Sequence, residues 1–326
     1  VYLAVTVLIG IISGIYTSAY LSRLKVMSIL KNVTHTGKKR QLFRSILIIV
    51  QLVIFCSFVS ATIIIRLQYR YALSKDNGYY TKNVLIVDLG RRFTGYAAYI
   101  NSIKSSPNVI SASGVMEGVP MQGSMTMMIP NFEDKEKKVK VEGMAVDYDF
   151  ISTMGIQILK GREFLRDFGS DMTGSVMLNE KAVKDLGITD PLGKLIGGQT
   201  IIGIVKDFNL HSLHSDIPPL TISMTDEYIQ QVFVHYKPGT IDNVIPLLEN
   251  EWKKQVPDEP FRYSTIEDII KEIYSSERNL STIVTIFAIF TLVIAASGLF
   301  GLILLLPVQE PRRLVSEKFL AVPKKL

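Results

Sequence analysis

The chain has 326 residues, of which 48% are hydrophobic and 20% are charged. This apolar content is high for a wholly soluble protein, so we expect part of the chain to lie in lipid. The single cysteine, Cys56, excludes an intrachain disulfide, and the net charge of +6 comes from two short basic segments that need no nucleic-acid partner.

Three long runs contain no Asp, Glu, Lys or Arg: residues 1–22, 45–65 and 279–309. Each is about as long as, or longer than, the ~20 residues that a helix needs to cross about 30 Å of hydrocarbon. The sequence therefore predicts transmembrane helices at 1–22, 45–66 and 281–306. The first and third runs contain small residues of the kind found where membrane helices pack closely, namely Gly10, Gly14, Gly298 and Gly301.

The start of the first run does not resemble a signal peptide, because it has neither an initiating Met nor a basic segment before the apolar residues. We expect it to follow a preceding part of a longer protein.

The segment between the first two runs, residues 23–44, is strongly basic. It has seven basic residues and no acidic one: Arg23, Lys25, Lys31, Lys38, Lys39, Arg40 and Arg44. By the positive-inside rule we expect a cytoplasmic loop here, which anionic lipid of the inner leaflet would attract. Residues 67–280 are then expected on the outer side of the membrane.

Residues 67–280 have the mixed strand and helix patterns of an α+β domain. Strands are expected at 83–89, 109–114, 125–129, 139–146, 175–178, 200–206, 220–224, 231–236 and 261–265. Helices are expected at 95–106, at 180–187 with Asn179 as its cap, and at 240–256. The sequence thus predicts a membrane protein in which transmembrane helices carry an exported α+β domain on helical stalks.

The stretch "MQGSMTMMIP" (121–130) is rich in methionine. It fits either a flexible apolar binding surface or a strand with an adaptable core face, and we favour the core. The following "EDKEKKVK" (133–140) is typical of a solvated turn between strands.

Both ends of the domain have helical patterns that continue into the membrane runs. At the C-terminal end, residues 264–280 place five apolar side chains at helical spacing: Ile266, Ile269, Ile270, Ile273 and Tyr274. Because no Gly or Pro separates them from the third apolar run, the pattern predicts one continuous helix. Residues 63–80 likewise extend the second membrane helix outward as far as Gly78. Two such stalks would pass movement from the membrane to the domain, although passive tethering is the alternative.

The stretch "VKDFNLHSLHSD" (205–216) contains two of the four histidines, His211 and His214, flanked by Asp207 and Asp216. On a helix the two imidazoles would share a face and could bind zinc together with a carboxylate. A polar loop after the preceding strand explains the same residues. Since no fixed third and fourth ligands accompany the pair, we favour the loop and predict neither a metal nor another cofactor.

Four segments carry a family resemblance by their order and spacing. They are "VEGMAVDYDFISTMGIQILKGREFLRDFGSD", "VMLNEKAVKDLGITDPLGKLI", "IIGIVKDFNLHSLHSDIPPL" and the run that begins "FRYSTIEDIIKEIYSSERNL". Together they resemble the periplasmic core and following membrane helix of FtsX-like, MacB-type ABC transporter permeases. Residues 8–31 also look like the last membrane helix of a preceding permease half, so the resemblance covers nearly the whole chain.

The resemblance implies a multi-pass protein of the bacterial inner membrane in which a separate cytoplasmic ATPase drives motions of the periplasmic domain. It implies as partners the ABC ATPase subunit, a second permease copy, membrane lipid and a periplasmic protein. The chain itself has no G-x-x-x-x-G-K-[ST] phosphate loop, since "GITDPLGK" (187–194) lacks the final Ser or Thr. We therefore expect no enzyme activity in this chain.

No motif selects the cargo among peptides, antibiotics and lipoproteins. A membrane-anchored periplasmic binding module without transport activity remains the alternative function.

The C-terminal end departs from the family pattern. After "GLFGL" (298–302) the family continues into a cytoplasmic coupling segment and two further membrane helices, whereas this chain reads "ILLLPVQEPRRLVSEKFLAVPKKL". Pro307 and Pro311 interrupt a helix there. We expect residues 307–326 to be a cytoplasmic tail, shortened by truncation or a shifted reading frame, that cannot couple to the ATPase.

Overall fold

The structure, a computed structural model, describes residues 38–90, 93–116, 118–120 and 125–303. The chain divides into two compact units, one made of Val1–Thr62 with Val284–Leu326 and the other of Ile63–Ile283. The predicted membrane helix at 1–22, the basic residues before Lys38 and the tail at 307–326 lie outside the described residues. Each unit is considered separately below.

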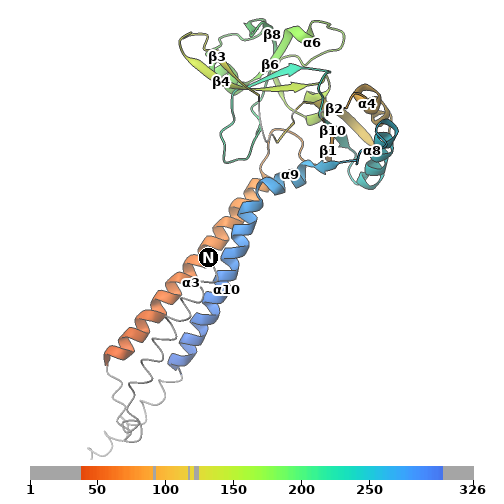
Figure 1. Ribbon diagram of the computed structural model, residues 1–326. Coiled ribbons are helices and arrows are strands. Elements are labelled where there is room, and N and C mark those ends of the chain that lie inside the picture. Colours follow the sequence, from red (N-terminus) through yellow and green to blue (C-terminus); the bar gives the residue numbers. More distant parts are fainter. Residues whose placement is uncertain (1–37, 91–92, 117, 121–124, 304–326) are drawn as a thin grey trace, which may run out of the picture. The chain divides into compact units, whose positions relative to one another are not determined.

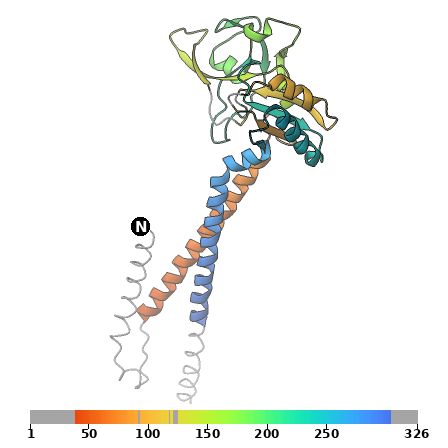
Figure 2. The same cartoon turned by 45° about the vertical axis from the view of Figure 1, so that its right-hand side comes forward.

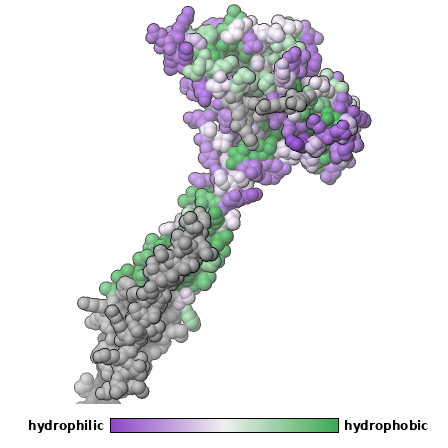
Figure 3. All heavy atoms as spheres, viewed as in Figure 1, coloured by the Kyte–Doolittle hydropathy of each residue, from purple (hydrophilic) through white to green (hydrophobic). Residues whose placement is uncertain are grey.

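The described part of the first unit consists of two long helices, α3 (Lys38–Ser74) and α10 (Ser275–Ile303), which also extend into the second unit. Two segments of them are long and apolar enough to cross a membrane, Ser45–Ser74 with 30 residues and Ser275–Phe300 with 26. Their large apolar side chains are mostly exposed in the structure (Figure 3), as is expected of helices whose surroundings are lipid.

Within the first unit the two helices pack on each other through an aromatic pair and a glycine. The rings of Phe58 and Phe287 stack with their centroids 6.0 Å apart. A methyl group added at Gly298 would lie 3.4 Å from Gln51 Oε1, so the glycine allows close approach of α3. The prediction that Gly298 lies at a helix–helix contact is confirmed.

Hydroxyl side chains on these helices bond to the backbone of the preceding turn. Ser57 donates to the Val53 carbonyl at 2.9 Å, Thr62 to that of Phe58 at 2.8 Å, and Thr291 to that of Phe287 at 2.9 Å. A hydroxyl satisfied by its own helix can face hydrocarbon at lower cost than one that needs water.

The second unit is built on one mixed sheet of 11 strands (Figure 1). Along the sheet the order is β11 (Tyr263–Thr265), β1 (Val84–Asp88), β10 (Gln231–Tyr236), β2 (Val109–Val115), β4 (Lys138–Val146), β9 (Leu220–Met224), β6 (Ser175–Asn179), β8 (Gln199–Val205) and β5 (Ile158–Gly161). In addition, β3 (Met125–Pro130) pairs with β4, and β7 (Leu195–Ile196) pairs with β8. The pairs β4–β9 and β6–β8 are parallel, and the other pairings are antiparallel.

Helices α4 (Tyr96–Lys104) and α8 (Ile241–Gln255) lie side by side against the part of the sheet that contains β1, β10 and β2 (Figures 1 and 2). Their shared core contains Trp252, the only tryptophan, stacked on Phe93 with centroids 5.2 Å apart. The remaining helices of the domain are short: α5 (Phe150–Met154), α6 (Asp171–Gly174), α7 (Glu180–Asp185) and α9 (Ile266–Ile273).

The strands and helices expected from the sequence patterns within this domain are confirmed. Helix α7 begins as predicted, with the Asn179 side chain accepting from the Ala182 N–H at 2.9 Å, and Gly187 follows its end with φ +66°. The short elements β5, β7, α5 and α6 were not predicted, because two to five residues are too few to show a period.

The expectation that the Met-rich stretch packs in the core is wrong for its described part. Met125, Met127 and Met128 on β3 are 60%, 40% and 58% exposed. The reason is that β3 bonds to β4 alone and lies outside the main path of the sheet, so few residues cover it. The turn at 131–137 is largely exposed, so the solvated turn predicted over 133–140 is confirmed for 133–137, whereas 138–140 belong to β4.

Candidate coupling site

The five apolar residues predicted to form the C-terminal stalk lie together against one core cluster. Ile266, Ile270 and Tyr274 are buried in that cluster, and Ile269 and Ile273 pack against it partly buried. The same cluster contains residues of the sheet, among them Phe233 on β10 and Leu220 on β9. The stalk candidates are therefore part of the domain core at the point where the chain leaves the domain.

These residues do not belong to one continuous helix with the apolar run, and the prediction of a single helix is wrong. Helix α9 begins at a Thr265 cap, whose hydroxyl accepts from the Asp268 N–H at 3.0 Å, and it ends at Ile273. Tyr274 has φ −98° and ψ 20°, and α10 begins at Ser275. The Tyr274 N–H is bonded back to α9, while its carbonyl accepts from the Arg278 N–H at 3.2 Å as the first bond of α10.

The physical reason for this break is the environment of Tyr274 rather than its helix propensity. Its side chain is only 4% exposed, and its hydroxyl accepts a hydrogen bond from the Leu213 N–H at 2.7 Å. These tertiary contacts hold a residue that local sequence would place within a helix.

The end of α3 reaches the same core. Tyr69 and Ala72 pack against the cluster that holds Tyr274, and α3 ends two residues later, at Ser74. The Asp76 side chain then accepts from the Gly78 N–H at 2.9 Å in a tight turn. Gly78 has φ +83° and a Cβ there would lie 2.7 Å from Phe208 Cβ, so this turn requires glycine.

The two histidines of the 205–216 stretch bind to different carboxylates. His211 Nε2 lies 2.9 Å from Glu142 Oε2 on β4, whereas His214 Nε2 lies 3.5 Å from Glu277 Oε1 on α10. Asp207 instead accepts from the Lys181 N–H. Among the described residues no group of three or more His, Cys, Asp or Glu side chains is arranged to hold a metal ion.

The four basic residues predicted to lie in a cytoplasmic loop are helical in the structure. Lys38, Lys39, Arg40 and Arg44 lie within α3 (Lys38–Ser74). Lys and Arg are good helix formers, and no Gly or Pro occurs between Lys38 and Ser45, so the helix extends beyond the apolar run.

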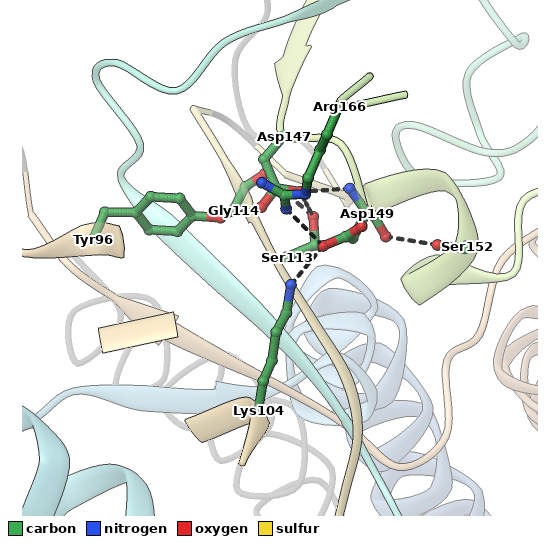
Figure 4. Close-up of polar contacts among 8 residues, drawn as sticks. All are labelled: Tyr96, Lys104, Ser113, Gly114, Asp147, Asp149, Ser152 and Arg166. Atoms are coloured by element: carbon green, nitrogen blue, oxygen red, sulfur yellow. Dashed lines mark hydrogen bonds and ion pairs between the residues drawn. The ribbon is translucent and has the colours of Figure 1, made fainter. Parts of the chain in front are cut away.

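A cluster of polar residues around the buried Ser113 and Asp147, here called the polar joint, was not predicted from the sequence. It comprises Tyr96, Lys104, Ser113, Asp147, Asp149 and Arg166 (Figure 4). It lies where β2 and β4 meet through the single residue pair Val115 and Val146, which is the narrowest connection along the sheet. Short polar segments such as "VDYD" have no periodicity that would indicate such a cluster.

Asp147 is the buried centre of the polar joint, with 4% of its surface exposed. Its carboxylate accepts hydrogen bonds from the Ser113 hydroxyl of β2, from the Tyr96 hydroxyl of α4 and from the Asp149 N–H at 3.0 Å. Burial and then the charge of Asp147 raise the pKa of Tyr96 well above its usual value, so the hydroxyl stays protonated and donates.

The Asp149 side chain forms ion pairs with two basic side chains from different elements. Its carboxylate lies 2.5 Å from Lys104 Nζ at the end of α4 and 3.0 Å from Arg166 Nη2 in the loop after β5, as Figure 4 shows. Burial raises the pKa of the Asp149 carboxyl, but the hydrogen bonds and charges of Lys104 and Arg166 outweigh this, and the pKa lies below its ordinary value.

The polar joint therefore fixes the end of β4 and the start of α5 to β2 and to both ends of α4. The core cluster around Phe150 and Phe233, whose rings meet edge to face at 5.7 Å, joins the same two parts of the sheet. These contacts connect the strands near α8 with the strands near α7.

No protein-family model matches the chain, and no curated protein matches it. Solved structures similar to it include the periplasmic region of MacB from Actinobacillus actinomycetemcomitans, with 16% identity and a TM-score of 0.42 over 62% of this chain and 97% of that chain. Another is the extracellular domain of the noncanonic ABC-type transporter YknZ from Gram-positive bacteria, with 15% identity and a TM-score of 0.34 over 59% of this chain and 92% of that chain. The periplasmic region of a MacB protein, from the family that the sequence resembles, is one of these similar structures.

Proposed function

We propose that this chain is a permease subunit of a MacB-type ABC transporter that transmits movement from its membrane helices to its exported domain. The observation that carries the proposal is that the C-terminal end of α3 and the residue directly before α10 reach the same core cluster. Tyr69 and Ala72 of α3 pack against this cluster, and Tyr274, next to the first residue of α10, is buried in it. Force transmission needs helix ends that are fixed in the domain they move, whereas a passive tether has no such requirement.

The energy for that movement would come from a separate cytoplasmic ABC ATPase, as the family resemblance implies. The sequence lacks a phosphate-binding loop of its own. The same resemblance gives a second permease copy and a periplasmic protein as further partners, and export of a peptide, antibiotic or lipoprotein-like cargo as the outcome. In this proposal the domain lies in the periplasm and residues 38–44 lie at the cytoplasmic face.

The placement in the membrane is tested by labelling single cysteines in a Cys56→Ser background. In intact cells with a permeable outer membrane, an impermeant maleimide should react with Lys135→Cys, in the exposed turn between β3 and β4, and not with Lys38→Cys. Preferential labelling of Lys38→Cys would reverse the topology.

Because the tail at 307–326 is not expected to couple to the ATPase, transmission is tested by hydrogen–deuterium exchange of the chain extended by the family's coupling segment, bound to its ATPase in lipid nanodiscs. Trapping the ATPase with ATP and vanadate should change the exchange of peptides covering 266–280, at the α9–α10 junction, relative to the ADP state. Identical exchange in the two states would contradict force transmission.

One observation favours the alternative of a membrane-anchored binding module. Strand β3 exposes three methionines, and its outer edge is free of pairing within the described sheet, which is a surface suited to binding an extended apolar segment. In that case the exchange of 125–130 would respond to a periplasmic ligand, while 266–280 would not respond to nucleotide.

A further inference from the structure

The segment Phe208–His214, here called the histidine segment, contacts three parts of the domain that are far apart in the sequence. Its first residue, Phe208, is 1% exposed in the core cluster and meets the ring of Tyr79 edge to face at 6.3 Å. The next residue, Asn209, donates its backbone N–H to the Asn77 carbonyl at 2.9 Å. This end of the segment is therefore fixed to the turn that follows α3.

The other end of the segment contacts the α9–α10 junction. Leu213 donates its N–H to the Tyr274 hydroxyl at 2.7 Å. The His214 ring lies 5.9 Å from the Tyr274 ring, and its Nε2 lies 3.5 Å from Glu277 Oε1 in the first turn of α10. His214 and Glu277 are 67% and 28% exposed as side chains, so their pair is partly screened by solvent.

Between these two ends the segment is joined to the sheet. His211 Nε2 lies 2.9 Å from Glu142 Oε2, and both side chains are largely covered, with 25% and 12% exposed. Glu142 is on β4, the strand that ends at the polar joint through Asp147. The histidine segment thus connects both helix ends to the strand that links the two parts of the sheet.

The two ends of the segment are held by different kinds of contact. The α3 side rests on a fully buried aromatic pair and on a glycine turn that admits no side chain. At the α10 side, Leu213 is only partly buried against the cluster and His214 is 67% exposed, and they hold Glu277 and the buried Tyr274 through one neutral hydrogen bond, a ring contact and a 3.5 Å contact. Phe208, at the α3 side, is buried more deeply than Leu213 and His214, so we expect the α10 side of the segment to detach first.

We propose that the histidine segment is an asymmetric clamp. It stays fixed to the end of α3 and to β4, and it releases the α9–α10 junction, so that α10 moves relative to the sheet while α3 keeps its position. This deepens the proposed function and rests on it, because the clamp determines which of the two helices passes movement to β4.

The test is hydrogen–deuterium exchange of the full chain in detergent micelles, without ATPase or nucleotide, so its result is independent of the proposed function. Tyr274→Phe removes the acceptor of the Leu213 N–H and keeps the ring. We expect the peptide containing Leu213 and the peptide covering 274–280 to exchange roughly fivefold faster, the factor of one ordinary hydrogen bond. The peptide covering 76–80 should be unchanged.

Tyr228→Phe is the matched control, since Tyr228 is 72% exposed and lies outside the clamp. The fluorescence of Trp252 checks that each variant is folded. As a second variant, His214→Ala should accelerate exchange at the same two peptides by a smaller factor. Unchanged exchange around Leu213 in Tyr274→Phe, or an equal acceleration at 76–80, would overturn the clamp.

Discussion

The polar joint and the histidine segment both connect elements that are distant in the sequence, but they differ in burial. In the joint, Asp147 is almost fully buried and accepts from two hydroxyls and an N–H. In the histidine segment, the contacts to α10 are polar and partly exposed. Because buried polar contacts cost more to break than exposed ones, we expect the contacts of the polar joint around Asp147 to persist when those between the histidine segment and the start of α10 break.

The largest expected effect is at the polar joint. Asp147→Ala should lower the free energy of unfolding by about 4 kcal/mol, because two hydroxyls and one N–H lose their acceptor, at about 1–3 kcal/mol for each buried group. Urea unfolding of the full chain in micelles, followed by Trp252 fluorescence, measures the change. Asp258→Ala, at an exposed carboxylate, is the control and should change stability by less than about 0.5 kcal/mol.

The next effect concerns the core beneath the helix ends. Ile266→Ala should cost about 3 kcal/mol, as for other fully buried large-to-small changes, since Ile266 is 0% exposed. Ile273→Ala, on the same helix but only packed against the cluster, should cost about 1 kcal/mol. Equal costs for the two variants would mean that α9 does not present one buried face to the domain.

The ion pairs of Asp149 should make the joint sensitive to acid. Since the folded-state pKa of Asp149 lies below its ordinary value, its contribution is complete above about pH 4 and is lost as the pH falls further. Asp149→Asn should therefore cost about 1 kcal/mol at pH 7, limited by the partial exposure of the carboxylate. The difference from the wild type should shrink below about pH 4.

Unfolding curves of the wild type and Asp149→Asn between pH 7 and pH 3 measure this difference. Asp258→Asn provides the matched control at an exposed site. A difference that stays constant down to pH 3 would show that Lys104 and Arg166 do not stabilise the charged form.

The elements of the domain follow closely from local sequence. Four consecutive apolar residues, Val84 to Val87, form β1, and Asn179 and Gly187 mark the two ends of α7, because these signals are local to the chain. The break at Tyr274 is different, since residues 264–280 contain neither Gly nor Pro. It depends on Leu213, 61 residues away, whose N–H binds the tyrosine hydroxyl.

The same distinction explains why the candidate site was only half predicted. The apolar spacing of Ile266 and Ile270 identified the face of α9 that packs on the core. The partners of His211 and His214 could not be identified, because Glu142 and Glu277 are 69 and 63 positions away, as the residue numbers give. A pair of histidines three residues apart suggests a shared ligand only if the backbone between them is helical, and here it is not.

The smallest expected effects are at the two histidines. The difference between their stability costs measures how much stronger the segment's contact to the sheet is than its contact to α10. His211→Ala removes a 2.9 Å contact to a largely buried carboxylate on β4 and should cost about 0.5–1 kcal/mol. His214→Ala removes a 3.5 Å contact from an exposed ring and should cost less than about 0.5 kcal/mol. If the histidines instead shared a metal ion, either substitution would cause the same loss, and the protein would release zinc in proportion. Parallel measurements of unfolding and of zinc content by atomic emission decide between these outcomes. Equal costs for the two variants without zinc would show that the contacts to the sheet and to α10 are equally strong. A stoichiometric zinc ion that is lost in both variants would identify the two histidines as metal ligands.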